Sequence, residues 1–378
     1  MPNKKYRIYL SPPHMSGREI AYIQEAFAEN FISTAGKNLL QFEKQLTQIV
    51  GIDSAVALNS GTAAIHLALK VLNIQAGDEV LCSSFTFVAT ANPVLYLNAV
   101  PIFIDSEPET WNMCPQALES AIQDRLKKGK QPKAIIVVHL YGMPAKLKEI
   151  LAIAQHYQIP VIEDAAEALG STYQNKMVGT FGEIGLYSFN GNKIITTSGG
   201  GALVATNPEY TLKALFLATQ GKDPAPHYQH SEVGFNYRMS NIVAGIGLGQ
   251  LEVLPERVKK KRAIFAYYQE SLSQYDFIQF QPELPGHYAN RWLSCLVLAP
   301  GQSVTKEKIQ SALAAELIES RPLWKPLHEQ PLFAHCSYYG QNIAGTLFQQ
   351  GLCLPSGSDL TDTDLELIVR VIQKAIEK

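Results

Sequence analysis

The sequence predicts an α/β protein with a mostly parallel sheet covered by helices on both faces, together with a smaller α/β domain. Between residues 55 and 205, short apolar segments alternate with segments of helical periodicity. Several segments, such as 134–138, are apolar throughout, which is typical of strands buried on both faces. A chain of 378 residues can also form two domains. We therefore expect a large domain over residues 1–250 and a smaller domain over residues 251–378, entered by a long helix.

The elements follow in order from the local pattern. Two helices are expected first, over residues 16–29 and 39–50. Strands are then expected over residues 55–58, 79–82, 100–104, 134–138, 160–162, 184–189 and 202–205. Helices between and after them are expected over residues 62–72, 87–97, 115–127, 145–156 and 208–218. Past a loose section at 221–235, the pattern predicts a helix over 242–254 that runs into a polar helix ending near 272, a strand over 293–298, and helices over 306–317 and 365–376.

Composition restricts the class of protein. The net charge of -2 gives no broad field for nucleic acid or an anionic membrane, and the basic run 257–262 is interpreted as a solvated helix face. No run is long enough to span a bilayer, and the N-terminus lacks the apolar core of a signal peptide. Scattered cysteines, odd in number and without CxxC spacing, argue against a disulfide framework or a metal site: Cys82, Cys114, Cys295, Cys336 and Cys353. We expect a cytoplasmic globular protein.

Lys193 stands in a polar, glycine-rich loop between the strands expected at 184–189 and 202–205, and that loop has no other charge. An amine surrounded by small residues and hydroxyls can be partly desolvated, which lowers its pKa and makes it nucleophilic toward carbonyls. The alternative is a surface hairpin in which the lysine keeps the loop soluble.

Polar groups also follow other expected strands. Residues 59–63 place hydroxyls and Gly61 at a helix start, where a phosphate can bind, although an ordinary Ser/Thr N-cap has the same composition. Ser188 could add a further hydroxyl to that phosphate site. Asp164 follows a buried strand and could keep a nitrogen heterocycle protonated, or it could cap a helix.

An aromatic pair, Phe85 and Phe87, could stack on a planar ring or pack in the core. Together, a phosphate anchor, a ring face, a strand-end Asp164 and Lys193 are what pyridoxal 5'-phosphate (PLP) requires.

Five segments, at 59–63, 84–92, 163–168, 188–193 and 234–239, resemble the signatures of the DegT/DnrJ/EryC1/StrS sugar aminotransferases. They follow the order and spacing of that family over nearly the whole chain. The resemblance implies PLP as cofactor, the aspartate aminotransferase-like fold (fold type I) and a homodimer with active sites at the subunit interface.

The resemblance also implies roles for individual residues. Lys193 would hold PLP as a Schiff base, and Asp164 would pair with the pyridine nitrogen. The phosphate would be held by Gly61, Thr62 and Ser188.

Three further cofactor contacts are implied in the same way. Phe87 would lie against the ring, and Asn236 would reach the phosphate from the neighbouring subunit. Glu167, where relatives often have Gln or His, would contact the ring substituent or the sugar. Some relatives replace the lysine by histidine and dehydrate their substrate, so Lys193 favours transamination.

Segments 188–201, 320–328 and 353–358 are similar to the 4-aminotransferases of bacillosamine and legionaminic acid synthesis. This implies L-glutamate as donor and UDP-2-acetamido-2,6-dideoxy-hexos-4-ulose as acceptor, with UDP-4-amino-4,6-dideoxy-N-acetylglucosamine as product. Four side chains could supply charge for the diphosphate or form structural ion pairs instead: Arg238, Arg321, Lys325 and His328.

Two other hypotheses stay open. One is a 3- or 4-aminotransferase for a dTDP- or GDP-linked keto sugar. The other is a PLP-binding regulatory protein without turnover, which Lys193, Asp164 and the absence of a DNA-binding segment argue against.

Overall fold

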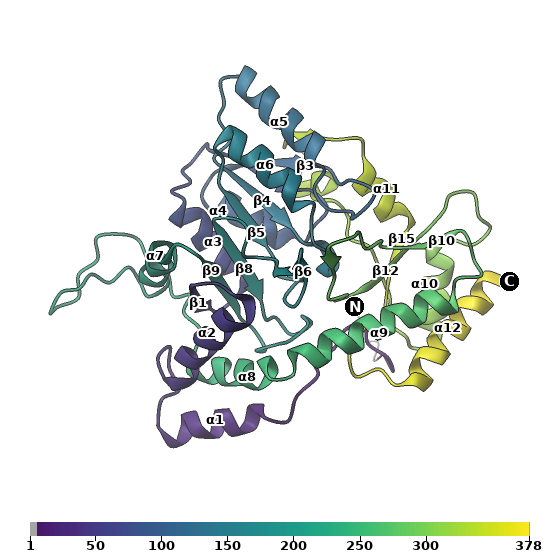
Figure 1. Cartoon of the computed structure of the whole chain (residues 1–378), viewed down its shortest axis with the longest axis horizontal. Helices are drawn as coiled ribbons and strands as arrows, with labels where there is room; N and C mark the ends of the chain where they lie inside the picture. Colours follow the sequence, from purple (N-terminus) through teal and green to yellow (C-terminus); the bar gives the residue numbers. More distant parts are fainter. Residues whose placement is uncertain (1–5, 378) are drawn as a thin grey trace.

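A computed structural model describes residues 6–377, and its centre is an eight-stranded sheet (Figure 1). The strand order is β1-β9-β8-β5-β4-β2-β3-β14. Strand β9 is antiparallel to both neighbours, and the other pairings are parallel, so the prediction of a mostly parallel sheet is confirmed. The strands are β1 (Ser54–Leu58), β2 (Glu79–Ser83), β3 (Val100–Ile104), β4 (Ala134–Val138), β5 (Val161–Asp164), β8 (Ile184–Ser188), β9 (Gly201–Ala205) and β14 (Tyr338–Tyr339).

Both faces of this sheet are buried. Along β4, Ile135 and Val137 join one apolar cluster, whereas Ala134 and Ile136 join another on the opposite face. The uninterrupted apolar pattern of the strand follows from this double burial. Helices of the first cluster are α2 (Lys37–Val50), α5 (Pro115–Lys127), α6 (Leu147–Tyr157) and α8 (Asn241–Leu251), and helices of the second are α3 (Gly61–Val71), α4 (Asn92–Tyr96) and α7 (Pro208–Ala218). Helix α1 (Glu19–Ala28) packs on α8.

A second, four-stranded antiparallel sheet has the order β10-β12-β15-β13. Helix α9 (Leu254–Ser271) runs from the large sheet to this smaller one (Figure 1). The other members are β10 (Ile278–Phe280), β12 (Ser294–Leu298), β13 (Arg321–Pro322), β15 (Gly351–Leu354), α10 (Lys306–Ala315), α11 (Ile343–Gln350) and α12 (Asp362–Glu377). A three-stranded sheet contains β6 (Thr172–Tyr173), β7 (Lys176–Met177) and β11 (His287–Tyr288).

We propose that the two domains divide near residue 250. Two segments pack with the domain on the other side of this boundary. Strand β14 lies beyond that point in the chain but pairs with β3 of the large sheet. Ile8, from the N-terminal segment, packs into the apolar cluster of the smaller sheet.

Two expected helices are interrupted by proline. The segment expected at 87–97 forms a 3-10 turn, η1 (Val88–Thr90), followed by α4, in which Pro93 lies in the first turn. Likewise, the expected continuation from 242 to 272 is divided into α8 and α9, and Pro255 lies in the first turn of α9. Proline has no N–H for a helical hydrogen bond, so it is tolerated only where a helix begins. Three further 3-10 turns are η2 (Leu140–Gly142), η3 (Leu327–Glu329) and η4 (Pro331–Phe333).

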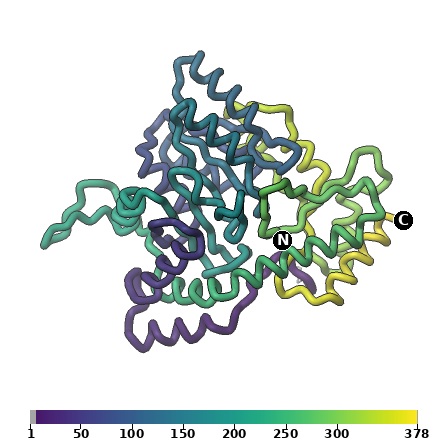
Figure 2. Tube along the Cα trace, viewed as in Figure 1, coloured from purple at the N-terminus to yellow at the C-terminus, as the bar shows by residue number. Residues whose placement is uncertain are grey.

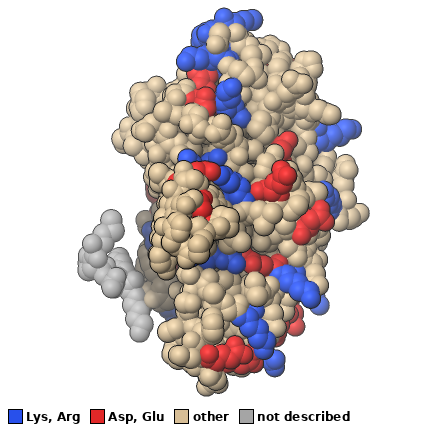
Figure 3. All heavy atoms as spheres, turned by 90° about the vertical axis from the view of Figure 1, so that its left-hand side faces the viewer, with Lys and Arg blue, Asp and Glu red and all other residues tan. Residues whose placement is uncertain are grey.

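The segment between α7 and α8 projects from the body of the molecule (Figure 2). Tyr228 and Val233 in this segment are 84% and 79% exposed. The face on that side carries acidic and basic side chains interspersed over a largely uncharged surface (Figure 3). Among residues 6–377, the structure contains no helix with the length and apolar character needed to cross a membrane. The first five residues, on which the expectation about a signal peptide partly rests, lie outside the described part.

Candidate active site

A cavity of about 1130 Å³ lies where the large sheet meets the smaller domain. Asp164 and Ser188 are the last residues of β5 and β8, and both line it, as does the start of α3. The carboxyl ends of parallel strands are the usual position of sites in α/β sheets. The opposite wall comes from residues 292–293, 319 and 321–325 and from the N-terminal segment 9–13.

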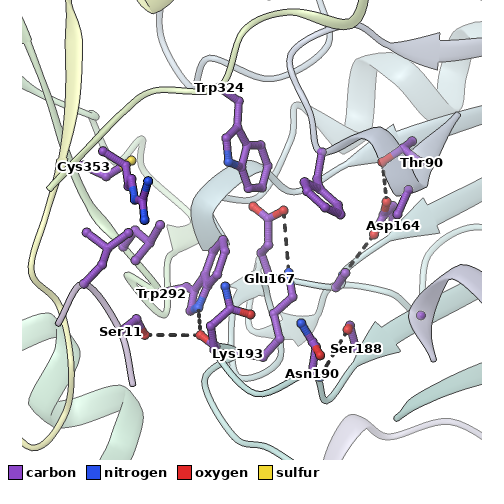
Figure 4. Close-up of a pocket in the computed structure, with 18 of the residues that line it drawn as sticks. Ser11, Thr90, Asp164, Glu167, Ser188, Asn190, Lys193, Trp292, Trp324 and Cys353 are labelled. Carbon is purple, nitrogen blue, oxygen red and sulfur yellow. Dashed lines mark hydrogen bonds and ion pairs between the residues drawn. The ribbon is translucent and has the colours of Figure 1, made fainter. Parts of the chain in front are cut away.

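Lys193 lies inside this cavity with its side chain only 11% exposed (Figure 4). Its Nζ atom is 4.0 Å from Oε1 of Glu167. Burial lowers the pKa of Lys193, and the carboxylates of Glu167 and Asp164 partly oppose that effect. The lysine is therefore not on a surface hairpin, and it has the desolvated environment that favours a nucleophilic amine.

Asp164 is buried and accepts a hydrogen bond of 2.7 Å from Oγ1 of Thr90. Its other carboxylate oxygen accepts the N–H of Ala166 at 3.2 Å. Burial raises the pKa of Asp164, and the Thr90 hydroxyl acts in the opposite direction. The residues that follow Asp164 form a turn, so this aspartate does not cap a helix. Its position at the cavity wall suits a carboxylate that faces a cationic ring nitrogen.

The start of α3 forms another part of the wall. Ser60 is its N-cap, with Oγ accepting the N–H of Ala63 at 3.0 Å, so the N-cap interpretation is correct for Ser60. Gly61 and Thr62 begin the helix, where the first N–H groups have no helical partner. A Cβ on Gly61 would lie 3.0 Å from Cβ of Ser188, so glycine lets the helix start and the end of β8 come together. This arrangement fits a phosphate.

The two phenylalanines after β2 have different environments. Phe85 is buried in the core, as the structural alternative expected. Phe87 is 54% exposed, lines the cavity, and has its ring centroid 5.7 Å from that of Trp324. An aromatic face, a helix start, a buried amine and a buried carboxylate thus share one cavity, and this donor set fits PLP.

Glu167 is buried, and its Oε2 accepts the N–H of Tyr141 at 2.6 Å. Burial raises the pKa of Glu167 to about 7, with Lys193 acting in the opposite direction. Because burial disfavours the charged forms of both Lys193 and Glu167, this pair is suited to exchanging a proton.

Two predictions for positively charged groups require correction. Arg238 is buried in an ion pair with Glu43, in which Nη2 lies 3.1 Å from Oε2, and it also donates to the carbonyl of Ala57 at 3.1 Å. It does not line the cavity, so Arg238 is a structural ion-pair residue.

His328 is also held away from the cavity lining. Its Nδ1 hydrogen bonds with Oγ of Ser84 at 2.6 Å, and its ring stacks on Tyr338 with centroids 3.8 Å apart. Burial lowers the pKa of His328, which disfavours the charge expected of it. Of the four candidates, Arg321 and Lys325 do line the cavity, and Arg321 pairs with Glu319 at 2.7 Å.

Asn236 is exposed on the projecting segment and does not line the cavity of its own chain. Its carbonyl accepts Nδ2 of Asn59 at 3.2 Å. A contact between Asn236 and the cofactor would therefore have to come from a second subunit, and this stays a prediction.

Several lining residues had not been singled out: Thr90, Trp292, Glu319, Trp324 and Phe348. Thr90 and Trp324 fall inside segments that carried the family resemblance, so position within a motif was an available signal. Trp292 had no such signal, because it lies outside these segments. Within residues 6–377, no group of three or more His, Cys, Asp or Glu side chains is arranged to hold a metal ion.

Comparison with known proteins places this geometry in context. The DegT/DnrJ/EryC1/StrS aminotransferase family model matches residues 13–373. The chain is 54% identical over 370 residues to "Putative pyridoxal phosphate-dependent aminotransferase EpsN" of Bacillus subtilis (strain 168), covering 97% of this chain and 95% of that protein. It is 37% identical over 372 residues to GDP-perosamine synthase of Caulobacter vibrioides, covering 98% of each.

A solved structure of a DegT DnrJ EryC1 StrS aminotransferase from Brucella abortus has a TM-score of 0.90, with 31% identity and 96% of each chain covered. This similarity confirms the PLP-dependent transferase architecture of fold type I. The chain therefore belongs to the DegT/DnrJ/EryC1/StrS aminotransferase family, and it is a PLP-dependent nucleotide-sugar aminotransferase.

Proposed function

We propose that this enzyme transfers the amino group of L-glutamate to UDP-2-acetamido-2,6-dideoxy-hexos-4-ulose, giving UDP-4-amino-4,6-dideoxy-N-acetylglucosamine. The observation that carries the residue assignments is the meeting of Lys193, Asp164 and the start of α3 in one cavity. We assign Lys193 as the residue that bonds to the cofactor.

The remaining cofactor contacts follow from position. The N–H groups at Gly61 and Thr62 and the hydroxyl of Ser188 would hold the phosphate. Phe87 would lie against the ring. When bound, PLP supplies an electron sink for the carbanion formed at the reacting carbon.

Asp164 would supply the carboxylate that keeps the ring nitrogen of the bound cofactor protonated. Hydrogen bonds from Thr90 at 2.7 Å and from the N–H of Ala166 at 3.2 Å each engage one carboxylate oxygen and fix the orientation of the carboxylate. Because Asp164 must be ionised for this role, the hydroxyl of Thr90 supports the reaction by favouring the charged form.

Lys193 acts as the base and acid of both half-reactions. Its Nζ removes a proton from the α carbon of glutamate and later delivers one to C4 of the sugar. The lowered pKa leaves more of the free amine in its neutral, basic form near pH 7 than an exposed lysine would have. Glu167, at 4.0 Å, can take up or return a proton at Nζ between these steps.

The cavity has room for a nucleotide sugar beside the cofactor. Its volume of about 1130 Å³ exceeds the roughly 300–1,000 Å³ of most single-ligand sites. Arg321 and Lys325 are the lining cations that would face the diphosphate. The segments 320–328 and 353–358 support a UDP-linked N-acetyl sugar, since they carry the similarity to 4-aminotransferases of that class.

A GDP-linked keto sugar is the second candidate. It is favoured by the 37% identity over 98% of both chains to a protein named GDP-perosamine synthase. A dTDP-linked sugar would need the same catalytic groups. A regulatory protein without turnover is disfavoured, because Lys193 and Asp164 are both in place.

We further propose a homodimer in which the projecting segment carries Asn236 into the partner's site. The projecting segment exposes two apolar side chains, Tyr228 at 84% and Val233 at 79%, which a partner subunit would cover. A cytoplasmic location is proposed because all five cysteines are free, as is usual in a reducing compartment.

A single-turnover absorbance experiment tests the substrate. The PLP-loaded enzyme is treated with glutamate until the absorbance band of the lysine-bound cofactor disappears, and UDP-, GDP- or dTDP-linked 4-keto-6-deoxy sugars are then added separately. Fast return of the band with only the UDP-N-acetyl sugar is expected. If the band returns only with the GDP- or the dTDP-linked sugar, the substrate belongs to that nucleotide class. A loaded enzyme that does not respond to glutamate would contradict the proposed donor.

A further inference from the structure

The indole of Trp292 lies against the amine of Lys193. Nζ of Lys193 is 4.3 Å from the centroid of the Trp292 ring, and Glu167 is its second neighbour at 4.0 Å (Figure 4). Trp292 is 2% exposed and lines the cavity from the smaller domain, just before β12. None of the roles assigned above includes this residue.

Every polar group of Trp292 is engaged. Its N–H donates to Oδ1 of Asn290 at 2.8 Å, and its carbonyl accepts Nζ of the buried Lys261 at 3.1 Å. The indole Nε1 donates to the carbonyl of Asn192 at 2.7 Å. The ring also stacks on Tyr141, with centroids 6.4 Å apart and an interplanar angle of 27°. The position of the ring over Lys193 is therefore set before any ligand binds.

The ring has a physical role beyond filling space. The face of an indole attracts a cation through its quadrupole, and this attraction is stronger where water is excluded. The charged groups that face Lys193 are Glu167 and Asp164, and both are buried carboxylates. Burial of Glu167 raises its pKa to about 7, so it is not a permanent counter-charge. Among Glu167, Asp164 and the Trp292 ring, only the ring attracts a cation without itself having to be ionised.

We propose that Trp292 is a positioning residue whose indole face holds Lys193 while this lysine is protonated and not bonded to the cofactor. This rests on the proposed role of Lys193 as the cofactor-bonding residue. Held there, Nζ stays near both the ring and Glu167 in the cavity and does not turn away after its displacement. The bond from Nε1 to Asn192 attaches the ring to the residue next to Lys193, so the ring and the lysine loop keep a constant separation.

The proposal can be tested without a substrate. The full-length chain is loaded with pyridoxamine phosphate, a cofactor form that cannot bond to a lysine, so that Lys193 stays free. An amine-reactive reagent is applied over a range of pH, and mass spectrometry of the Lys193 peptide gives the pKa of this lysine. Trp292→Leu removes both the ring and its hydrogen bond, whereas Trp292→Phe removes the hydrogen bond and keeps an aromatic face. Trp324→Leu is the control, because that ring lines the cavity and no contact between it and Nζ is found within residues 6–377.

Removal of the ring should make Lys193 easier to deprotonate. In Trp292→Leu, the acid dissociation constant of Lys193 should rise about tenfold, which lowers its pKa by about one. Trp292→Phe should fall between the wild type and the leucine variant, and Trp324→Leu should match the wild type. If the leucine variant does not fold, Trp292→Met takes its place.

Two results would overturn the proposal. An unchanged titration in Trp292→Leu would mean that the ring does not hold the cation. Equal shifts in the leucine and phenylalanine variants would assign the effect to the hydrogen bond with Asn192. Failure of the sugar panel would leave this titration untouched, because neither glutamate nor a sugar enters it.

Discussion

Two buried lysines of this enzyme have the same chemistry but different surroundings. Burial lowers the pKa of both Lys193 and Lys261, the latter to about 7. Nζ of Lys261 donates to Oγ of Ser11 at 3.2 Å and to the carbonyls of Trp292 at 3.1 Å and Ser356 at 2.7 Å. Within residues 6–377, Nζ of Lys193 makes no hydrogen bond, and its polar contact is Glu167 at 4.0 Å.

The difference separates a structural amine from a reactive one. The three donors of Lys261 are all used, so this lysine connects the N-terminal segment, the loop of Trp292 and the end of β15. Lys193 has the same desolvation without those partners, and its amine therefore remains available for bonding to a carbonyl. Desolvation alone does not identify a catalytic lysine. In this enzyme, the number of fixed hydrogen-bond acceptors around the amine distinguishes Lys193 from Lys261.

The largest effect is expected from Lys193→Ala. Loss of this group removes the proposed base and acid of both half-reactions, so turnover should fall by at least about a thousandfold. The variant should still bind PLP through the phosphate site and Asp164, without the absorbance band of the lysine-bound cofactor. Steady-state kinetics and absorbance spectra measure both, with the exposed Lys128→Ala as control. Near-normal turnover in Lys193→Ala would contradict this distinction between the two lysines, because Lys193 would then have no catalytic role.

The same substitution at both sites should have different effects on stability. Lys261→Met leaves two buried carbonyls and a hydroxyl without their donor, and the free energy of unfolding should fall by about 2–4 kcal/mol. Lys193→Met removes a desolvated amine without fixed acceptors, so stability should be unchanged or slightly higher. Denaturant unfolding of the cofactor-free chains measures both. Equal losses at the two positions would show that the hydrogen bonds of Lys261 do not distinguish them.

A smaller effect on turnover is expected from Thr90→Val. This change removes the hydrogen bond that favours the ionised form of Asp164, so the pKa of that carboxyl should rise further. Because Asp164 must be ionised, activity should be lost at a higher pH on the acid side, with kcat lower by about tenfold. The pH profile of kcat/KM measures this shift, and Thr90→Ser should restore the profile. A profile that does not move in Thr90→Val would show that the hydroxyl only fills space.

The remaining effect is the pH dependence of stability. Lys261 has a pKa of about 7 when folded, below its ordinary value of 10.5, so the unfolded chain binds more protons between these values. Stability of the wild type should therefore rise with pH from about 7 toward 10.5, relative to Lys261→Met. The charged neighbours are Asp359, which raises this pKa, and Arg257, which lowers it. Denaturant unfolding of both chains over this pH range measures the rise. If the free energy of unfolding has the same pH dependence in both chains, the prediction is wrong.

The local pattern was sufficient for most of the fold. Strand β4 and helix α5 have the predicted bounds, because both follow from uninterrupted periodicity with clear ends. The expected helix at 87–97 was too long, since Pro93 and the turn at Thr90 interrupt it. At the site, Lys193 and Asp164 were predicted from their place after strands, whereas Arg238 and His328 were placed in the site by charge alone.

The sequence by itself determined the order of strands and helices, the family and the positions of Lys193 and Asp164, because periodicity and short motifs are local properties of the chain. Only the tertiary structure decided which cations face the cavity and what surrounds the amine. The Glu43 partner of Arg238 lies 195 residues away, and the carbonyl that fixes the Trp292 ring lies 100 residues away. Such contacts depend on the packing of distant segments, which local pattern does not specify.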